Sequence, residues 1–453
     1  MKPKLERRLG VADAAALVVS NVIGVGIFTT PGIICGILPR PSAILAVWAL
    51  GGLLSFSGAM AYAELAALQP KAGGEYVYLR EAFGRLAAFL TGWTSFVAGF
   101  SGAIAAGAIG LTAYLGRFFP AAADASHLWS FSLGPLSLTV SRPTLLAILV
   151  ILALGAVHIR GLRPGRMVQD TLTTALLAGL LLFIVLGFAK GRGSIENLTG
   201  GGRSPATNWL LALIPVMFSY SGWNAAAYMA EEVRDPARSV PRALGWGTAA
   251  VIAIYLALNV VYLYALPAGE LAGRINAADA AADRLLGSAA AGWLAVLATV
   301  IIVSSLSAMT LAGPRIYYAM ARDGLFFRAA ARIHPRFGTP AVAIVAQTGW
   351  SCLLVLSGTF NQLLTYTGFA VVLFSAVAVC ALFVLRRKTP RARRPFRAWG
   401  YPIAPAIFAL ASLAIVVNAI VEAPLPSAIG LLVIAAGIPL YGVMQRRRTP
   451  PGD

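Results

Sequence analysis

Two short stretches place helix-breaking residues inside apolar surroundings. The first, VSNVIGVGIFTTPG, covers residues 19–32 and contains three glycines and Pro31. The second, FSYSGWN, covers residues 218–224 and lies within a long apolar run. Glycine and proline weaken a helix, because glycine loses much conformational freedom on folding and proline lacks the backbone N–H. Both stretches therefore predict interrupted helices.

An interrupted helix offers backbone groups that can bind a ligand. The helix that resumes after the break has free N–H groups at its N-terminus, and these attract anions. The helix that ends before the break has free carbonyl groups, which suit an ammonium ion. One break therefore presents donors and acceptors close together, which matches a zwitterion such as an α-amino acid. Gly24 and Gly26 would allow such a ligand to approach the backbone closely.

The elements around these stretches are those of a membrane protein. Of the 453 residues, 58% are hydrophobic and only 12% are charged, against about 25% charged residues in soluble domains. About 20 apolar residues are needed to cross the hydrocarbon core. Twelve candidate spans occur, at residues 11–37, 42–68, 84–117, 143–160, 168–189, 208–232, 241–266, 288–320, 340–357, 360–386, 403–421 and 425–444. We expect an all-α integral membrane protein with twelve transmembrane helices.

The basic residues indicate how the spans are oriented. Most of the 36 Lys and Arg residues fall in the tails, residues 1–10 and 445–453, and in the loops after every second span. Cytoplasmic loops carry an excess of Lys and Arg, so both termini are expected in the cytoplasm. The formal charge of +19 then reflects topology and contact with the lipid bilayer, and it predicts no nucleic-acid partner. The Ala- and Arg-rich composition favours a bacterial plasma membrane.

The interrupted spans are the first and the sixth, which suggests an internal repeat. Spans 3 and 8 are unusually long, and each follows an amphipathic segment that could lie at the membrane interface. Residues 11–189 and 208–386 would then be two five-span units of opposite orientation, followed by two further spans within residues 403–444. A lone G-x-G in a membrane helix usually serves packing. Two breaks at matching positions instead point to a transporter binding site.

No cluster of residues indicates an enzyme, a metal site or a cofactor. Cys35, Cys352 and Cys380 lie far apart in apolar stretches, and the three histidines are also scattered. Neither a disulfide framework nor a His-based catalytic centre follows from these spacings. A channel would show a continuous polar stripe, and a major-facilitator protein would divide six and six. A membrane-embedded enzyme and a channel remain the alternatives from other classes.

Five motifs, spread in order along the chain, carry a resemblance to a known family. They are NVIGVGIFTTPG (21–32), YAELAALQPKAGGEYVYLREAFG (62–84), FSYSGWNAAAYMAEEVRDPARSVPRAL (218–244), RIYYAMARDG (315–324) and LRRKTPRARRPFR (385–397). The chain resembles the amino acid–polyamine–organocation (APC) superfamily, and among its members the L-type amino acid transporter-like permeases. The resemblance implies a five-plus-five inverted repeat with two extra C-terminal helices. It also implies alternating access around a central amino acid site. A partner subunit is possible in some eukaryotic relatives, but nothing in this sequence demands one, so no obligatory protein partner is evident.

The resemblance assigns candidate roles to residues at the first break. Their backbone groups would hold the carboxylate and amine of the substrate, and they are Ile23, Gly24, Val25 and Gly26. Many relatives have Ser at the position of Val25. A contact through the backbone N–H survives this difference, whereas a contact through a hydroxyl does not.

Roles at the second break follow in the same way. Phe218 matches the aromatic gate that closes over the substrate in the family. Backbone contacts from span 6 would come from Ser219, Tyr220 and Ser221, and Asn224 would tie the broken region to its neighbours.

One departure from the family concerns coupling. In many relatives a lysine of span 5 neutralises the position where sodium-coupled relatives bind a cation, but here the matching residue is Leu176. Ser304, Ser305 and Ser307 of span 8 could bind Na⁺, although such hydroxyls commonly hydrogen-bond within membrane helices. We expect exchange or uniport without obligatory Na⁺. Na⁺- or H⁺-coupled symport of an amino acid or polyamine is the alternative.

Charged residues within the spans are sparse. Glu64, near one end of span 2, and Glu422, near one end of span 11, are the clearest cases. Glu231 and Glu232 close span 6. We interpret Glu64 and Glu231 as gate or ion-pair residues. Arginines that could pair with the residues at the end of span 6 are Arg80, Arg234 and Arg238.

The predicted topology can be checked by labelling. In a variant without the three native cysteines, a cysteine placed after Arg448 should not react with an impermeant maleimide in intact cells, because the tail is expected in the cytoplasm. It should react once the membrane is permeabilised. Ser126→Cys, in a loop expected outside, is the matched control that should react in intact cells. Labelling of the tail from outside would contradict the topology.

Overall fold

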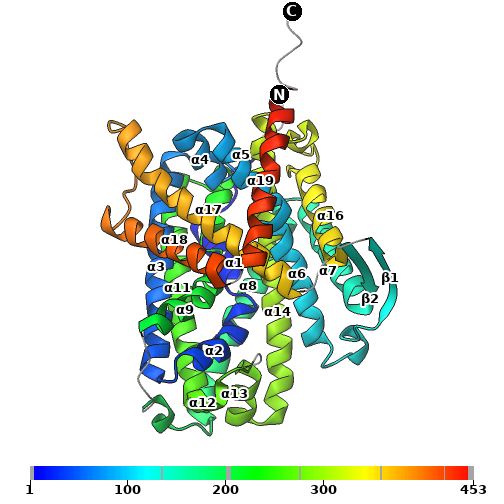
Figure 1. The fold of residues 1–453 in the computed structure, drawn as a ribbon, viewed down its shortest axis with the longest axis vertical. Helices are drawn as coiled ribbons and strands as arrows, with labels where there is room; N and C mark the ends of the chain where they lie inside the picture. Colours follow the sequence, from blue (N-terminus) through cyan, green and yellow to red (C-terminus); the bar gives the residue numbers. More distant parts are fainter. Residues whose placement is uncertain are drawn as a thin grey trace, which may run out of the picture.

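The computed structural model describes residues 5–133, 136–199, 206–274, 277–357, 360–422 and 424–446. In these ranges the chain forms a bundle of long helices (Figure 1). Among the described residues, nine helices are long and apolar enough to cross a membrane, and the pair Val11–Val22 and Gly26–Ile37, bent by 46°, forms a tenth candidate. Asn208–Ser219 and Ala341–Ser357 are shorter apolar helices. A helix satisfies its own backbone hydrogen bonds, as hydrocarbon requires, so the chain is a helical, multi-pass membrane protein.

The elements of the first half follow the predicted spans closely. They are α1 (Val11–Val22), α2 (Gly26–Ile37), α3 (Pro41–Leu68), α4 (Glu75–Phe83), α5 (Arg85–Thr94), a π-helical turn (Ser95–Gly99), α6 (Phe100–Leu115), α7 (Arg142–Ile159) and α8 (Leu162–Lys190). Here α5, the π-helical turn and α6 together form the long third span. The short helix α4 is the amphipathic segment that precedes it.

The second half begins with the segment that the sequence predicts as the sixth span. Its elements are α9 (Ala206–Ser219), α10 (Ala225–Tyr228), α11 (Pro236–Ala265), α12 (Ala268–Leu271), α13 (Ala277–Leu286), α14 (Ser288–Ala312), α15 (Pro314–Arg322), α16 (Ala341–Ser357), α17 (Phe360–Lys388), α18 (Ile403–Glu422) and α19 (Pro424–Arg446). Single-turn 3₁₀ helices occur at Pro120–Ala122, Ile195–Leu198, Ala230–Glu232 and Arg328–Ala331. Helix α13 precedes the eighth span as α4 precedes the third.

The structure adds one feature that the sequence analysis did not predict. Strands β1 (His127–Leu133) and β2 (Leu136–Ser141) pair in antiparallel fashion between α6 and α7, with Trp129 opposite Val140 and Phe131 opposite Leu138. The rings of Trp129 and Phe131 stack at 6.0 Å on one face. Alternating apolar and polar residues favour a strand, but the sequence analysis makes no prediction for this loop between spans.

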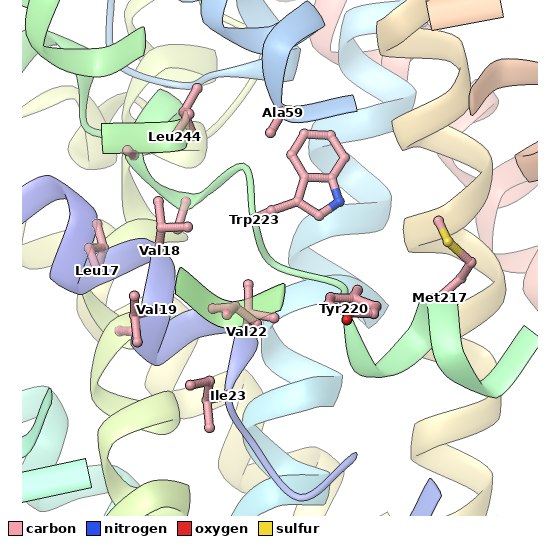
Figure 2. Packing of buried hydrophobic residues seen from close by; sticks show 14 of the residues in the cluster. Leu17, Val18, Val19, Val22, Ile23, Ala59, Met217, Tyr220, Trp223 and Leu244 are labelled. Atoms are coloured by element: carbon pink, nitrogen blue, oxygen red, sulfur yellow. The ribbon is translucent and has the colours of Figure 1, made fainter. Parts of the chain in front are cut away.

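The core forms around α1 and the segment that links α9 to α10. Val18, Val22, Tyr220 and Trp223 belong to one buried cluster (Figure 2). The Trp223 ring lies perpendicular to that of Tyr62 in α3, with 4.9 Å between centroids. Such edge-to-face pairs favour close packing of aromatic rings. The irregular segment is thus held by large side chains on neighbouring helices.

A buried ion pair joins the interrupted sixth span to the end of the eighth. Arg315 donates from Nε to Oε1 of Glu232 at 2.8 Å and from a terminal nitrogen to Oε2 at 3.1 Å, with both side chains at most 1% exposed. The carbonyl of Glu232 also accepts from the N–H groups of Arg8 and Leu9. Helix α15, which carries Arg315, contacts α4 and α5, and Figure 1 shows these two helices at one end of the long axis. Arg80, a predicted partner, pairs with Asp323 and Glu81 instead.

Removal of the buried arginine should destabilise the fold. Arg315→Met leaves Glu232 buried without its partner, a change that typically costs about 3–5 kcal/mol. Arg322→Met is the matched control, because Arg322 is 49% exposed and its pair with Glu231 should contribute about 0–1 kcal/mol. Thermal unfolding in detergent should show a large drop in midpoint for Arg315→Met and little for Arg322→Met. Equal midpoints would contradict this ranking.

Candidate functional site

Two helix breaks lie against each other near the centre of the chain's fold. The first separates α1 from α2 at residues 23–25, and the second separates α9 from α10 at residues 220–224. Helix α1 contacts α10, and α2 contacts α9. Each half-helix of one span therefore packs against a half-helix of the other, and the irregular segments face a shared space.

Side chains from two helices, α1 and α11, hydrogen-bond to the backbone at these breaks. Asn21 donates from Nδ2 to the carbonyl of Gly222 at 2.9 Å. The hydroxyl of Tyr255 in α11 lies 3.0 Å from the carbonyl oxygen of Val22 and 3.1 Å from that of Ser219. The hydroxyl of one tyrosine thus lies within hydrogen-bond distance of the carbonyl groups that end both α1 and α9. Sequence analysis missed Tyr255, because its role depends on where α11 packs.

Close approach of the two breaks explains two of the glycines. A Cβ on Gly26 would lie 2.8 Å from Oγ and 3.2 Å from Cα of Ser219. Gly222 has a φ of +102°, and a Cβ there would meet the Asn21 carbonyl oxygen at 2.7 Å. Residues other than glycine rarely adopt such a backbone angle. Both positions therefore require glycine for contact between the spans.

A cavity of about 160 Å³ opens at the breaks. Of the predicted site residues, those that line it are Gly24, Val25, Gly26, Phe218, Ser219, Ser221, Asn224 and Ser305. Ile23 and Tyr220 are fully buried outside this lining, so any contact from them would be through the backbone, as the resemblance implies. The roles of all these residues in binding remain predictions.

The cavity wall also holds polar groups that sequence analysis did not select. Asn21 lines the cavity, and its Oδ1 is buried without a hydrogen-bond partner among the described residues. Glu75, Thr91, Thr94 and Ser95 line it as well. The first turn of α2 starts at Gly26 with no capping side chain among the described residues. The N–H of Phe28 donates to the carbonyl of Val25, which leaves the N–H groups of Gly26 and Ile27 available for an anion. Carboxylate and ammonium groups can therefore both find partners here.

Comparison with known proteins shows the family to which this chain belongs. Residues 9–444 match the model of a family described as amino acid permease. The chain belongs to this family. It is 30% identical over 448 residues to the serine/threonine exchanger SteT of Bacillus subtilis (strain 168), with 98% of each chain covered.

Two human relatives are similar over most of the chain. The human large neutral amino acids transporter small subunit 2 is 29% identical over 458 residues, covering 96% of this chain and 80% of the relative. The human cystine/glutamate transporter is 28% identical over 447 residues, covering 97% and 85%. These comparisons identify the chain as an amino acid permease of the APC superfamily, and the names are those of transporters rather than enzymes.

In the permease, uncharged side chains form a hydrogen-bond network between α1, α8 and α14. Ser304 Oγ donates to Ser20 Oγ at 3.0 Å, and Ser20 Oγ lies 2.5 Å from Thr173 Oγ1. Gln169 Nε2 lies 3.4 Å from Ser304 Oγ. Leu176 is buried, and no metal-binding group of three His, Cys, Asp or Glu occurs in the part of the chain that the structure describes.

The three span 8 serines therefore have different surroundings in the permease. Ser304 belongs to this network, Ser307 Oγ lies 3.0 Å from Nε2 of His158, and only Ser305 lines the cavity. Gln169 is a span 5 residue that sequence analysis missed, because the lysine was sought at the position of Leu176.

Glu64 and Glu231 form ion pairs at the end of the permease where α4 lies. Glu64 is fully buried and accepts from Arg386 at 2.9 and 2.5 Å and from the N–H of Ala398 at 2.7 Å. Arg394 Nε lies 3.2 Å from its Oε1. Glu231 accepts from Arg322 at 3.0 Å. Both acids thus have the ion-pair geometry that one of the two predicted roles requires, and a part in gating remains a prediction.

Two alanine substitutions can test the contact between the breaks. Gly26→Ala would force its Cβ against the backbone of Ser219, and overpacking of this kind costs about 1–3 kcal/mol. Gly24→Ala is the matched control, because the nearest atom to its Cβ is Ser305 Oγ at 3.5 Å, an ordinary contact. Gly26→Ala should lower the unfolding midpoint by clearly more than Gly24→Ala. Similar effects would show that α2 and α9 need not touch.

Proposed function

We propose that this permease exchanges small neutral amino acids across a plasma membrane, or carries them by uniport, through alternating access. The observation that carries the proposal is the cavity at the two facing helix breaks. Backbone donors at the start of α2 would bind the substrate carboxylate. Asn21 Oδ1 and carbonyl groups of the breaks would accept from its ammonium group. Phe218, which lines the cavity, would close over the bound molecule.

The size of the cavity supports a small substrate. A cavity of about 150 Å³ holds benzene, a molecule of about six non-hydrogen atoms, and the cavity here is about 160 Å³. Its wall includes the small residues Gly99, Ala103, Ala106 and Gly107. Serine, alanine and threonine fit these dimensions better than aromatic amino acids. The printed name of the Bacillus subtilis relative, a serine/threonine exchanger, agrees with this size.

We also propose that twelve spans form two inverted five-span units, residues 11–189 and 208–386, followed by α18 and α19. Breaks in the first and sixth spans support this arrangement. The short helices α4 and α13 before the third and eighth spans support it as well. The charge pattern of the loops supports cytoplasmic termini, and the composition supports a bacterial membrane.

We further propose that the permease acts without an obligatory protein partner and without Na⁺. The name of one human relative describes it as a small subunit, whereas the name of the Bacillus subtilis relative mentions no subunit. Two of the three candidate cation ligands, Ser304 and Ser307, already hydrogen-bond to side chains of other helices. A Na⁺ ion would have to displace these contacts.

Counterflow in liposomes tests this function. The purified chain alone, reconstituted with internal unlabelled L-serine, should take up external labelled L-serine to a transient excess, because only a transporter gives saturable counterflow. Replacement of Na⁺ by choline at fixed pH should leave this uptake largely intact. Liposomes without protein are the control.

Two results would contradict the proposal in different ways. Absence of counterflow for all small neutral amino acids would contradict the substrate class. Loss of uptake in choline, restored by Na⁺ and reduced by Ser305→Ala, would instead make span 8 a cation site.

A further inference from the structure

Glu75 is a buried acid on the wall of the transport cavity. It is the first residue of α4, a short helix outside the nine long spans, and it is 7% exposed. Tyr62 donates from its hydroxyl to Oε2 of Glu75 at 2.9 Å. The hydroxyls of Tyr228 and Thr91 also face the carboxyl group and favour its ionised form. Both of these residues line the same cavity.

The other titratable groups that face Glu75 are tyrosines. Tyr62 lies in α3, Tyr78 in α4, Tyr228 in α10 and Tyr317 in α15. Each is a phenol that is uncharged at neutral pH. No ion pair involves Glu75 among the residues that the structure describes.

The cations of the helices packed around α4 either pair with other groups or, like Arg85 of α5 and Arg387 of α17, are exposed. In α17, Arg386 pairs with Glu64, and Lys388 donates to the carbonyl of Ala82. In α15, Arg315 pairs with Glu232 and Arg322 with Glu231. On α4 itself, Arg80 pairs with Glu81 and Asp323.

Glu75 lacks the cationic partner that the other buried acids have. Glu64 and Glu232 are as deeply buried as Glu75, and each contacts an arginine. A buried carboxylate without a cation is costly, and such a group usually takes up a proton. Glu75 differs from the other two in facing a cavity. Its compensating positive charge can therefore come from the cavity, as a proton or as a cationic group of a ligand.

We propose that Glu75 is a proton-binding residue of the transport cavity, and that it holds a proton whenever a neutral amino acid fills that cavity. The inference rests on the proposed function, which supplies the neutral substrate. A bound amino acid displaces water from the cavity wall and so makes the ionised form of Glu75 more costly. Substrate and proton then bind with positive linkage, and each raises the affinity for the other by the same factor.

A hydrogen-bond path connects Glu75 with the helix break. Asn224, which borders the second break, donates from Nδ2 to the hydroxyl of Tyr228 at 2.8 Å. The Tyr228 hydroxyl faces Glu75. All three residues line the cavity. A substrate at the break can thus affect the carboxyl group both through displaced water and through this path.

The direction of the pH effect follows from the ionisation of Glu75. Burial raises the pKa of the Glu75 carboxyl, and the facing hydroxyls partly oppose this rise. Below that pKa the proton is already present and substrate binds at full affinity. Above it, substrate must bring a proton with it, so the apparent dissociation constant increases, by up to about tenfold per pH unit.

Equilibrium binding of labelled L-serine to the purified chain, between about pH 5 and pH 9, tests the proposal. Wild type should lose affinity as the pH rises. Glu75→Gln should bind at all pH values as wild type does at low pH, because the amide keeps the shape and donor of the protonated carboxyl. Glu196→Gln, at an exposed acid, is the matched control and should keep the wild-type profile.

A second variant and a direct proton measurement cover the case in which Glu75→Gln does not fold. Tyr62→Phe removes a donor to the ionised carboxylate, which raises the pKa of Glu75 further, so the loss of affinity should move to higher pH. Addition of L-serine to wild type in weakly buffered solution above that pKa should take up close to one proton for each serine bound. Absence of proton uptake would overturn the proposal.

Other results of these binding experiments distinguish failure of the role of Glu75 from failure of the proposed function. Serine binding that is independent of pH in wild type would overturn the role of Glu75 and leave the proposed function intact. Binding of L-lysine that strengthens with pH and disappears in Glu75→Gln would overturn it in favour of a cationic substrate. If wild type binds no small neutral amino acid at any pH, the proposed function fails, and the inference fails with it.

Discussion

Hydrocarbon offers no partner to a backbone N–H or C=O group, and this constraint governs the whole structure. Every uninterrupted span satisfies it within its own helix. The first and sixth spans do not, and they remain stable only because other side chains take over at the breaks. Tyr255 serves the carbonyls of Val22 and Ser219, and Asn21 serves Gly222. Polar groups at the breaks that lack a partner line a cavity, where a ligand can hydrogen-bond to them.

The same constraint applies to charge. Glu64 and Glu232 are buried with arginine partners at the end of the bundle where α4 lies. These pairs join segments far apart in sequence, so they hold the ends of the spans together as well as neutralising the acids. Glu75 is buried at the cavity without such a partner, and its neutralisation is therefore open to whatever enters the cavity. Glu64 and Glu232 therefore differ from Glu75 in having an arginine partner, and all three side chains are buried.

Helix positions were predictable because each span is determined by local composition. Each predicted span falls on a described helix or group of helices, including the bend at residues 23–25, and among the described residues nine helices, or ten with the bent pair, are long and apolar enough to cross a membrane. The motifs at the two breaks also indicated the site, and eight of the predicted residues line its cavity. The hairpin β1–β2 was missed, because the sequence analysis makes no prediction for the short alternating segment between two strong apolar runs.

The sequence by itself determined a helical membrane protein, its family, and the two places where helices break, since these depend on runs of neighbouring residues. Only the tertiary structure decided which side chains meet. It paired Glu232 with Arg315 rather than with Arg80, Arg234 or Arg238, joined Gln169 to Ser304, and placed Glu75 on the cavity wall. Local sequence records that these residues are polar. Arg315 lies 83 residues from Glu232, and Ser304 lies 135 residues from Gln169, so only helix packing brings these pairs together.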